Sequence, residues 1–325
     1  MTSQIVRTEG LVLRNLRYGD TSRVATLFTP TLGKISVIGK GVREPRSPFG
    51  SSLELFARSE YVVYFRSGRN LQMLKSGDII DVHRGLQESS FLFVYGCAVI
   101  EFLDRMLLEE EPSPPLYILA LRVLSRLQTA SKPRAREIFR AFQLRAASLL
   151  GYGLLLDGCL HCGRSLDEPA PVPSEAEVGD GVWLFRPSEG GALCPNCARA
   201  AESGHPLTVR ALLRIRSMVS AENRTSRDRQ EVPGVRDRGS ELFSDVPAAE
   251  TSLAHEGEPR IGFGVVRPLS EHAETSLAHD SERRKGASLE AELRWAEALD
   301  RIVEDFLHFH VERYRGLRSF RSGCP

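Results

Sequence analysis

Residues 1–80 alternate apolar and polar positions with the two-residue period of β-strands. Glycine, proline and aspartate interrupt this alternation at Tyr18–Asp20, Thr29–Gly33 and Ser67–Asn70, which is typical of turns. The runs between the turns predict five strands, at Ile5–Leu13, Val24–Phe28, Lys34–Lys40, Leu53–Phe65 and Leu71–Lys75. Five short strands without a helical period predict a small closed barrel of the OB type, because closure leaves no exposed edge strand.

From about residue 87 the apolar positions recur with a helical period. The pattern predicts helices over Phe91–Glu110, Leu116–Gln128 and Pro133–Leu150, the third followed by Gly151. Thr208 is a candidate N-cap for a fourth helix, and Ser288 for the last and longest one. Together they predict an α-helical domain built from residues 81–157, 205–220 and 288–325, and therefore an α+β multidomain fold.

Residues 221–287 lack the apolar density of the rest of the chain. They contain 23 charged residues among 67, and burial of the few large apolar side chains cannot offset the entropy of ordering the segment. The hexamer Glu250–His255 recurs as Glu274–His279. We therefore expect a disordered insertion that contains a local duplication, rather than a repeat protein.

Four of the six cysteines form two CxxC pairs, Cys159 with Cys162 and Cys194 with Cys197. Two residues between thiolates allow both sulfurs to reach one ion, and four thiolates complete the tetrahedron of a closed structural zinc site. We therefore predict a structural Zn²⁺ in a knuckle of residues 158–204. The long gap between the pairs, Gly163–Leu193, is rich in proline and glycine and predicts a loop rather than packed structure.

Two alternatives to zinc remain open, a pair of redox CxxC motifs and unoccupied thiols. A redox CxxC usually opens a helix in a βαβ unit, and no such unit is visible in the pattern. His161 could substitute as a ligand, but with four cysteines present we expect it at the surface. Cys97 lies in an apolar helical pattern and is expected in the core, and Cys324 is uninformative.

Positive charge is concentrated in the predicted barrel. The whole chain has a net charge of +1, whereas residues 1–80 carry 12 Lys/Arg against six Asp/Glu. A nucleic-acid site would therefore be a local patch, and a solvated strand face is the alternative interpretation. The candidate DNA-binding residues are Arg14, Arg17, Lys34, Lys40, Arg43, Arg46, Arg66 and Arg69. Aromatic side chains that could stack on bases are Phe49, Phe56, Tyr61, Tyr64 and Phe65, although alternation places about half of them in the core.

Several function classes lack their sequence signatures. The chain contains no P-loop, no HExxH motif, and no H-x-E element of a zinc deaminase. We therefore expect a protein that is not an enzyme. The longest apolar run, Phe91–Ile100, is about half of what spans a bilayer, and the N-terminus lacks a signal-peptide core, so we expect a cytoplasmic protein with no membrane partner.

The order of several motifs resembles the bacterial RecO family of recombination and repair proteins. These motifs are Glu9–Leu13, Tyr18–Asp20, Thr26–Thr29, Gly33–Lys34, Gly39–Arg43, Gly153–Asp157 before the first CxxC pair, and Leu317–Ser319 after the last helix. The resemblance covers roughly residues 1–220 and 288–325. It implies a mediator of the RecF pathway that binds single- and double-stranded DNA, anneals complementary strands and assists RecA loading.

The resemblance also implies partners, namely RecR, the acidic tail of the single-strand-binding protein and, further, RecF and RecA. It implies a nucleoid-associated location. The alternative function is a zinc-containing DNA-binding transcriptional regulator, which would need a recognition helix. No helix-turn-helix spacing is evident in the sequence.

Overall fold

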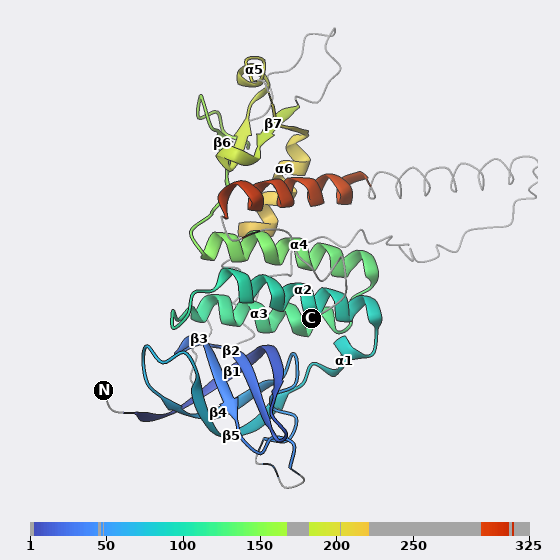
Figure 1. Cartoon of the computed structure of the whole chain (residues 1–325). Coiled ribbons are helices and arrows are strands. Elements are labelled where there is room, and N and C mark those ends of the chain that lie inside the picture. Colours follow the sequence, from blue (N-terminus) through green and yellow to red (C-terminus); the bar gives the residue numbers. More distant parts are fainter. Residues whose placement is uncertain are drawn as a thin grey trace, which may run out of the picture.

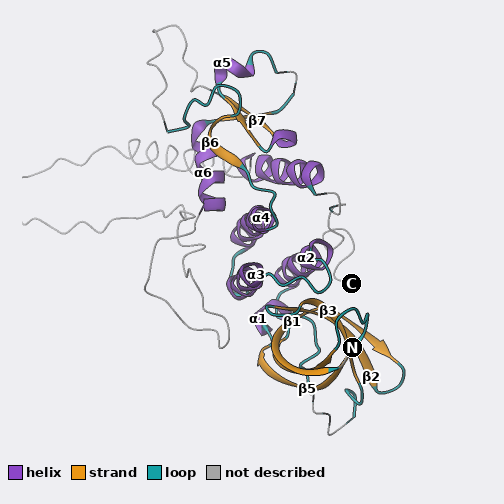
Figure 2. Cartoon of the chain, turned by 90° about the vertical axis from the view of Figure 1, so that its left-hand side faces the viewer, coloured by secondary structure: helices purple, strands orange, loops and turns teal. Residues whose placement is uncertain are grey.

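The computed structural model describes residues 3–44, 47, 49–167, 182–201, 203–220, 294–311 and 314. Figures 1 and 2 show three layers: a barrel, a group of helices packed on one end of it, and a small sheet beyond the helices. The expected insertion 221–287, Arg46, the cap at Ser288 and the Leu317–Ser319 motif lie outside the described residues. Within the described parts, no helix is long and apolar enough to cross a membrane.

The N-terminal domain is a closed five-stranded barrel, as predicted. Its strands are β1 (Gln4–Tyr18), β2 (Ser22–Thr29), β3 (Gly33–Gly39), β4 (Arg58–Phe65) and β5 (Gln72–Asp81). They are ordered β1-β2-β3-β5-β4, and all neighbours are antiparallel except β3 and β5, which pair in parallel. The predicted fourth strand begins too early. Leu53 is instead buried inside the barrel and Phe56 has a positive φ of 67°, so the chain forms turns until Arg58.

The helical layer contains four named helices and a C-terminal one. They are α2 (Ser90–Met106), α3 (Pro114–Leu127), α4 (Lys132–Leu149), α6 (Val209–Ser220) and the helix over residues 294–310, and the short α1 (Arg84–Gln87) leads into them. Cys97 is fully buried in this layer, as expected. The prediction that the helix from Phe91 reaches Glu110 is wrong: α2 ends at Met106, because Leu107 is extended and the next residues contact the barrel.

The barrel and the helices share an extensive interface. The rings of Phe28 and Tyr117 meet edge to face with centroids 5.4 Å apart. The Arg58 guanidinium donates two hydrogen bonds to the largely buried Glu9 carboxylate, at 2.8 and 3.0 Å. Gly33 has a φ of 69°, and a Cβ there would lie 2.5 Å from the backbone of Glu111. The close approach of the two layers therefore depends on a glycine at this turn.

The layer beyond the helices is a four-stranded sheet. Its strands are β6 (Leu155–Cys159), β7 (Trp183–Arg186), β8 (Gly191–Leu193) and β9 (His205–Leu207), ordered β6-β8-β7-β9. The prediction of a loop throughout 163–193 is therefore wrong for its second half. Trp183 and Phe185 are buried in the same hydrophobic core as the helices, and this burial outweighs the loop-like composition.

Candidate metal centre and nucleic-acid interface

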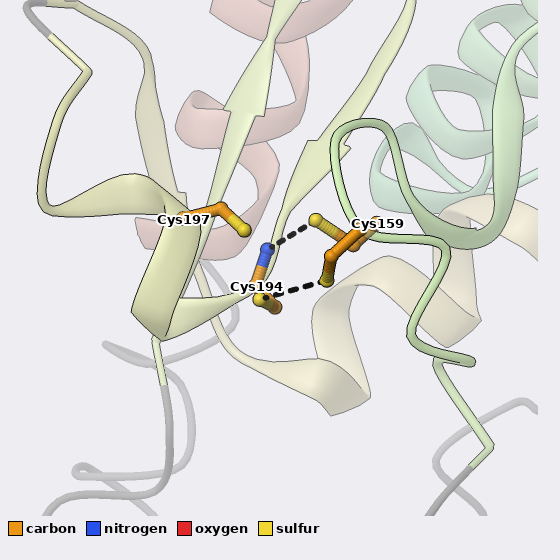
Figure 3. Close-up of side chains that lie close together, drawn as sticks. Cys159, Cys194 and Cys197 are labelled. Carbon is orange, nitrogen blue, oxygen red and sulfur yellow. Dashed lines mark hydrogen bonds between the residues drawn. The ribbon is translucent and has the colours of Figure 1, made fainter.

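The four predicted cysteine ligands come together at one end of this sheet. β6 and β8 pair in parallel, so their C-terminal ends lie at the same edge of the sheet. Cys159 is the last residue of β6, and Cys194 directly follows β8. Gly163, with a φ of 72°, closes the turn that returns Cys162 toward them. Cys197 lies on the short helix α5 (Pro195–Ala198), which begins directly after Cys194. Figure 3 shows the sulfurs of these segments converging.

The geometry of the cluster suits a metal ion. All four Sγ atoms lie within 4.8 Å of one another, the Cys162 and Cys194 sulfurs are 3.7 Å apart, and none of the four cysteines is in a disulfide. The Cys194 backbone N–H donates to the Cys159 sulfur at 3.3 Å. His161 is exposed, as expected, and its Nδ1 lies 3.5 Å from the Cys197 sulfur. The four cysteines could therefore hold one metal ion.

The surroundings of the cluster favour the thiolate form of Cys159 and disfavour that of Cys197. Burial raises the pKa of Cys159, but hydrogen bonds from the backbones of Cys162, Cys194 and His161 outweigh it and lower the pKa to about 6. Burial and the neighbouring cysteines raise the pKa of Cys197 to about 12. Thiolates packed this closely repel one another, so full ionisation of the cluster calls for a cation among them.

The structure describes seven of the eight predicted DNA-binding residues, all except Arg46, and separates them into three groups. The first lies at the β1–β2 hairpin end of the barrel. Arg17 pairs in register with Arg23, and Arg23 pairs with Gly39, directly before Lys40. The Arg43 backbone N–H donates to the Thr21 carbonyl, which brings this residue to the same end. Arg17, Lys40 and Arg43 are exposed, and no ion pair among the described residues engages them. Arg23 instead pairs with Glu54 at 2.6 Å.

The second group lies near the helices, and it includes a correction. Lys34 is largely buried: its Nζ donates to the Asp104 carbonyl at 2.7 Å and lies 3.6 Å from the Glu109 carboxylate. This environment argues against the predicted contact of Lys34 with DNA, because the amine already has partners inside the interface. Arg14 is half exposed and lies 3.7 Å from the Asp104 carboxylate.

The third group is the β4–β5 turn, where Arg66 and Arg69 are exposed. The turn is fastened to the helical layer, since Gly68 N–H and the Ser67 hydroxyl donate to the Glu110 carboxylate at 2.9–3.2 Å. Glu110 therefore places negative charge beside these two arginines. At the hairpin end, Arg17, Lys40 and Arg43 share the surface with two exposed acidic residues, Asp20 and Glu44.

Most of the aromatic residues proposed for base stacking are in the core. Phe49, Phe56, Tyr61 and Phe65 are buried, and Tyr64 is half buried. The exposed barrel aromatic that the sequence analysis missed is Tyr18, which is 60% exposed at the end of β1. The turn motif Tyr18–Asp20 could have predicted this exposure, because residues at the tip of a hairpin are exposed on both faces of the strands.

Comparison with known proteins decides the family. Residues 1–83 match the model described as "Recombination protein O N terminal", and residues 87–232 match "Recombination protein O C terminal". The chain belongs to the RecO family. The RecO matches cover the barrel, helices α2 to α6 and the cysteine cluster, and they extend to residue 232, into the segment expected to be an insertion.

Individual RecO relatives agree with this assignment. The protein from Geobacter metallireducens named "DNA repair protein RecO" is 33% identical over 201 residues, which are 62% of this chain and 75% of the relative. The RecO of Anaeromyxobacter sp. is 32% identical, with 63% and 75% covered. The RecO of Salinibacter ruber is 36% identical over 153 residues, but the match spans only 47% of this chain and 58% of the relative. These relatives are DNA repair proteins by name.

Proposed function

We propose that this chain is a recombination mediator of the RecF pathway that works without an enzymatic step of its own. It binds single- and double-stranded DNA, anneals complementary strands and assists RecA loading onto protein-coated single strands. The observation that carries the proposal is the group of exposed cations at the hairpin end of the barrel, Arg17, Lys40 and Arg43. The Arg43 guanidinium donates to the Asp20 carbonyl at 3.2 Å, but no ion pair among the described residues engages the three cations, and exposed cations at a barrel rim are suited to the phosphates of a DNA backbone.

The metal in the cysteine cluster is proposed to be a structural Zn²⁺. A tetrahedron of sulfurs at ~2.3 Å from zinc has edges of about 3.8 Å, which agrees with the 3.7 Å between the Cys162 and Cys194 sulfurs. Four protein thiolates leave no open position for substrate or water, so the ion would hold the β6–β8 edge and α5 together. This supports a binding protein rather than a metalloenzyme.

The helical layer is proposed to receive protein partners: RecR, the acidic tail of the single-strand-binding protein and, further, RecF and RecA. Burial, and then the positive charges of Arg134 and Arg122, lower the pKa of Arg126 below its ordinary value. Arg134 pairs with the Glu137 carboxylate at 3.1 Å, and an acidic segment lying over α3 and α4 would add to this pairing. Among the proposed partners, the acidic tail of the single-strand-binding protein has the matching charge.

A strand-annealing assay tests the proposed function. Complementary single strands coated with their binding protein should pair faster when the full-length protein is added, and R17A/K40A/R43A should lose most of that acceleration. The control variant K132A/R199A/R210A removes three exposed cations from the other layers, and therefore the same charge. It should retain the acceleration of annealing. Annealing that is unaffected by the wild-type protein would contradict the proposal.

A further inference from the structure

The four cysteines of the cluster differ in their exposure to solvent. Cys159 and Cys194 are buried, with 4% and 1% of their surfaces exposed, whereas Cys197 is half buried and Cys162 is exposed. A dissolved oxidant therefore reaches Cys162 most easily. Cysteines that sense oxidants share this exposure, and they usually lie beside a second cysteine that completes a disulfide.

Cys194 is the cysteine placed to react with an oxidised Cys162. The two sulfurs are 3.7 Å apart. The other two sulfurs each have a nitrogen neighbour instead. The Cys159 sulfur accepts a hydrogen bond from the Cys194 backbone N–H at 3.3 Å, as Figure 3 shows, and the Cys197 sulfur lies 3.5 Å from Nδ1 of His161. The geometry therefore favours a disulfide between the two CxxC pairs over one within either pair.

We propose that Cys162 is an oxidation site for hydrogen peroxide, and that its oxidation joins Cys162 to Cys194 and releases the metal ion. The inference goes beyond the proposed DNA-binding function. It rests on the proposed zinc ion only for the released metal, because the two sulfurs lie side by side whether or not an ion is bound.

The oxidation proceeds in two steps, with the peroxide as the oxidant. The Cys162 thiolate attacks one peroxide oxygen, the O–O bond breaks, and a sulfenic acid and a hydroxide form. The Cys194 thiolate then attacks the sulfenic sulfur, the S–S bond forms, and a second hydroxide leaves. Two protons from solvent convert the hydroxides to water. The two sulfurs together lose two electrons, and the peroxide gains them.

The disulfide removes half of the metal ligands. Thiolates are the metal-binding form of cysteine, and a closed structural zinc site needs four ligands. After oxidation only Cys159 and Cys197 remain as thiols in the cluster. Two ligands hold zinc far more weakly than four, so the ion leaves when the disulfide forms.

The same disulfide would replace the ion as the link between β6 and β8. The register of these two strands comprises two pairs, Leu155 with Gly191 and Cys159 with Ala192. Cys162 follows β6 by three residues and Cys194 follows β8 directly, so a covalent bond between them keeps this edge of the sheet closed. None of the four residues of α5, all of them described, is buried, and α5 loses its anchor when Cys197 loses the ion. Oxidation therefore frees α5 but retains the sheet.

Peroxide treatment of the zinc-loaded, full-length protein tests this. A chromogenic zinc indicator follows the release of metal, and peptide mapping by mass spectrometry locates the disulfide. The wild-type protein should release its zinc in proportion to the Cys162–Cys194 disulfide that forms, and dithiothreitol with added zinc should restore both. C162S and C197S each remove one ligand, but only C197S keeps both reacting cysteines, so C197S should form the disulfide and C162S should not.

Thermal unfolding distinguishes the disulfide from simple loss of metal. Peroxide-treated wild-type protein should have a higher unfolding midpoint than protein stripped of zinc by a chelator, because the disulfide still joins β6 to β8. Equal midpoints would show that the disulfide does not hold the sheet and would overturn that part of the inference.

The mapped pairing decides the rest. A disulfide within either CxxC pair, or oxidation of C162S as fast as of C197S, would overturn the inference. Zinc retained by protein that carries the Cys162–Cys194 disulfide would overturn the coupled release. Untreated protein without zinc would contradict the proposed structural zinc instead, and the disulfide mapped in that metal-free chain would still decide which cysteines react.

Discussion

The Lys34 ammonium donates a hydrogen bond of 2.7 Å to the backbone carbonyl of Asp104, 70 residues away in the sequence. One partner is at the start of β3 and the other is near the end of α2, so the bond joins the barrel to the helical layer. The Asp104 and Glu109 carboxylates lie 3.9 and 3.6 Å from the same amine. A cation in this position holds two layers together and is unavailable to DNA.

Replacement of Lys34 should therefore affect stability more than DNA binding. K34M should lower the free energy of unfolding by about 1–3 kcal/mol, because it leaves the part-buried Asp104 carbonyl without its donor and removes the amine that lies beside two carboxylates. K40M removes an exposed amine and should leave the free energy of unfolding nearly unchanged while weakening DNA binding. Urea unfolding and anisotropy on both variants check this; greater loss of DNA affinity in K34M than in K40M would return Lys34 to the DNA site.

The close contact at Gly33 gives a second prediction. Gly33 and Gly19 both have positive φ, 69° and 61°, but a Cβ at Gly19 meets nothing within 4 Å, whereas one at Gly33 meets the Glu111 backbone at 2.5 Å. G19A should cost only about 1 kcal/mol of backbone strain. G33A should cost clearly more, because the barrel must move away from the helices. Equal unfolding midpoints in urea would show that the interface tolerates the methyl group.

Metal analysis should find one zinc ion per chain. C194S should lower the metal content and the thermal unfolding midpoint, since the ion supplies folding free energy to the sheet that follows α4. DNA binding by the barrel should change little, because none of the barrel strands contains a metal-ligating cysteine. A metal-free chain with four reactive thiols and full stability would instead support the redox alternative.

Acidification should weaken the attachment of the C-terminal helix. Burial raises the pKa of Asp300, but hydrogen bonds from the Arg136 and Arg140 guanidiniums outweigh it and hold the pKa below its usual range. The stabilisation is therefore fully present above the unfolded value of about 4, and it is lost as pH falls through the lower folded pKa. Between pH 7 and pH 3, D300N should show a smaller drop in unfolding midpoint than wild type. Parallel curves would exclude this carboxylate as the cause.

The sequence predicted what depends on local pattern. Alternation located the barrel strands, and the CxxC spacing found all four clustered cysteines. What it missed depends on contacts between distant segments: Lys34 has the same local pattern as Lys40, and only the position of Asp104 distinguishes them. Likewise, Trp183 and Phe185 are too few to predict a packed sheet until the helices supply the rest of the core.

The salt dependence of single-strand binding tests the central claim most directly. Each phosphate contact on a single strand contributes about 0.7 to the slope of log affinity against log salt concentration. R17A/K40A/R43A should weaken binding of every sequence alike and reduce the magnitude of the slope by up to about 2, whereas the charge-matched K132A/R199A/R210A should keep the wild-type slope. If the barrel variant keeps the wild-type slope and affinity, or the control loses as much, the hairpin end of the barrel is not the DNA site.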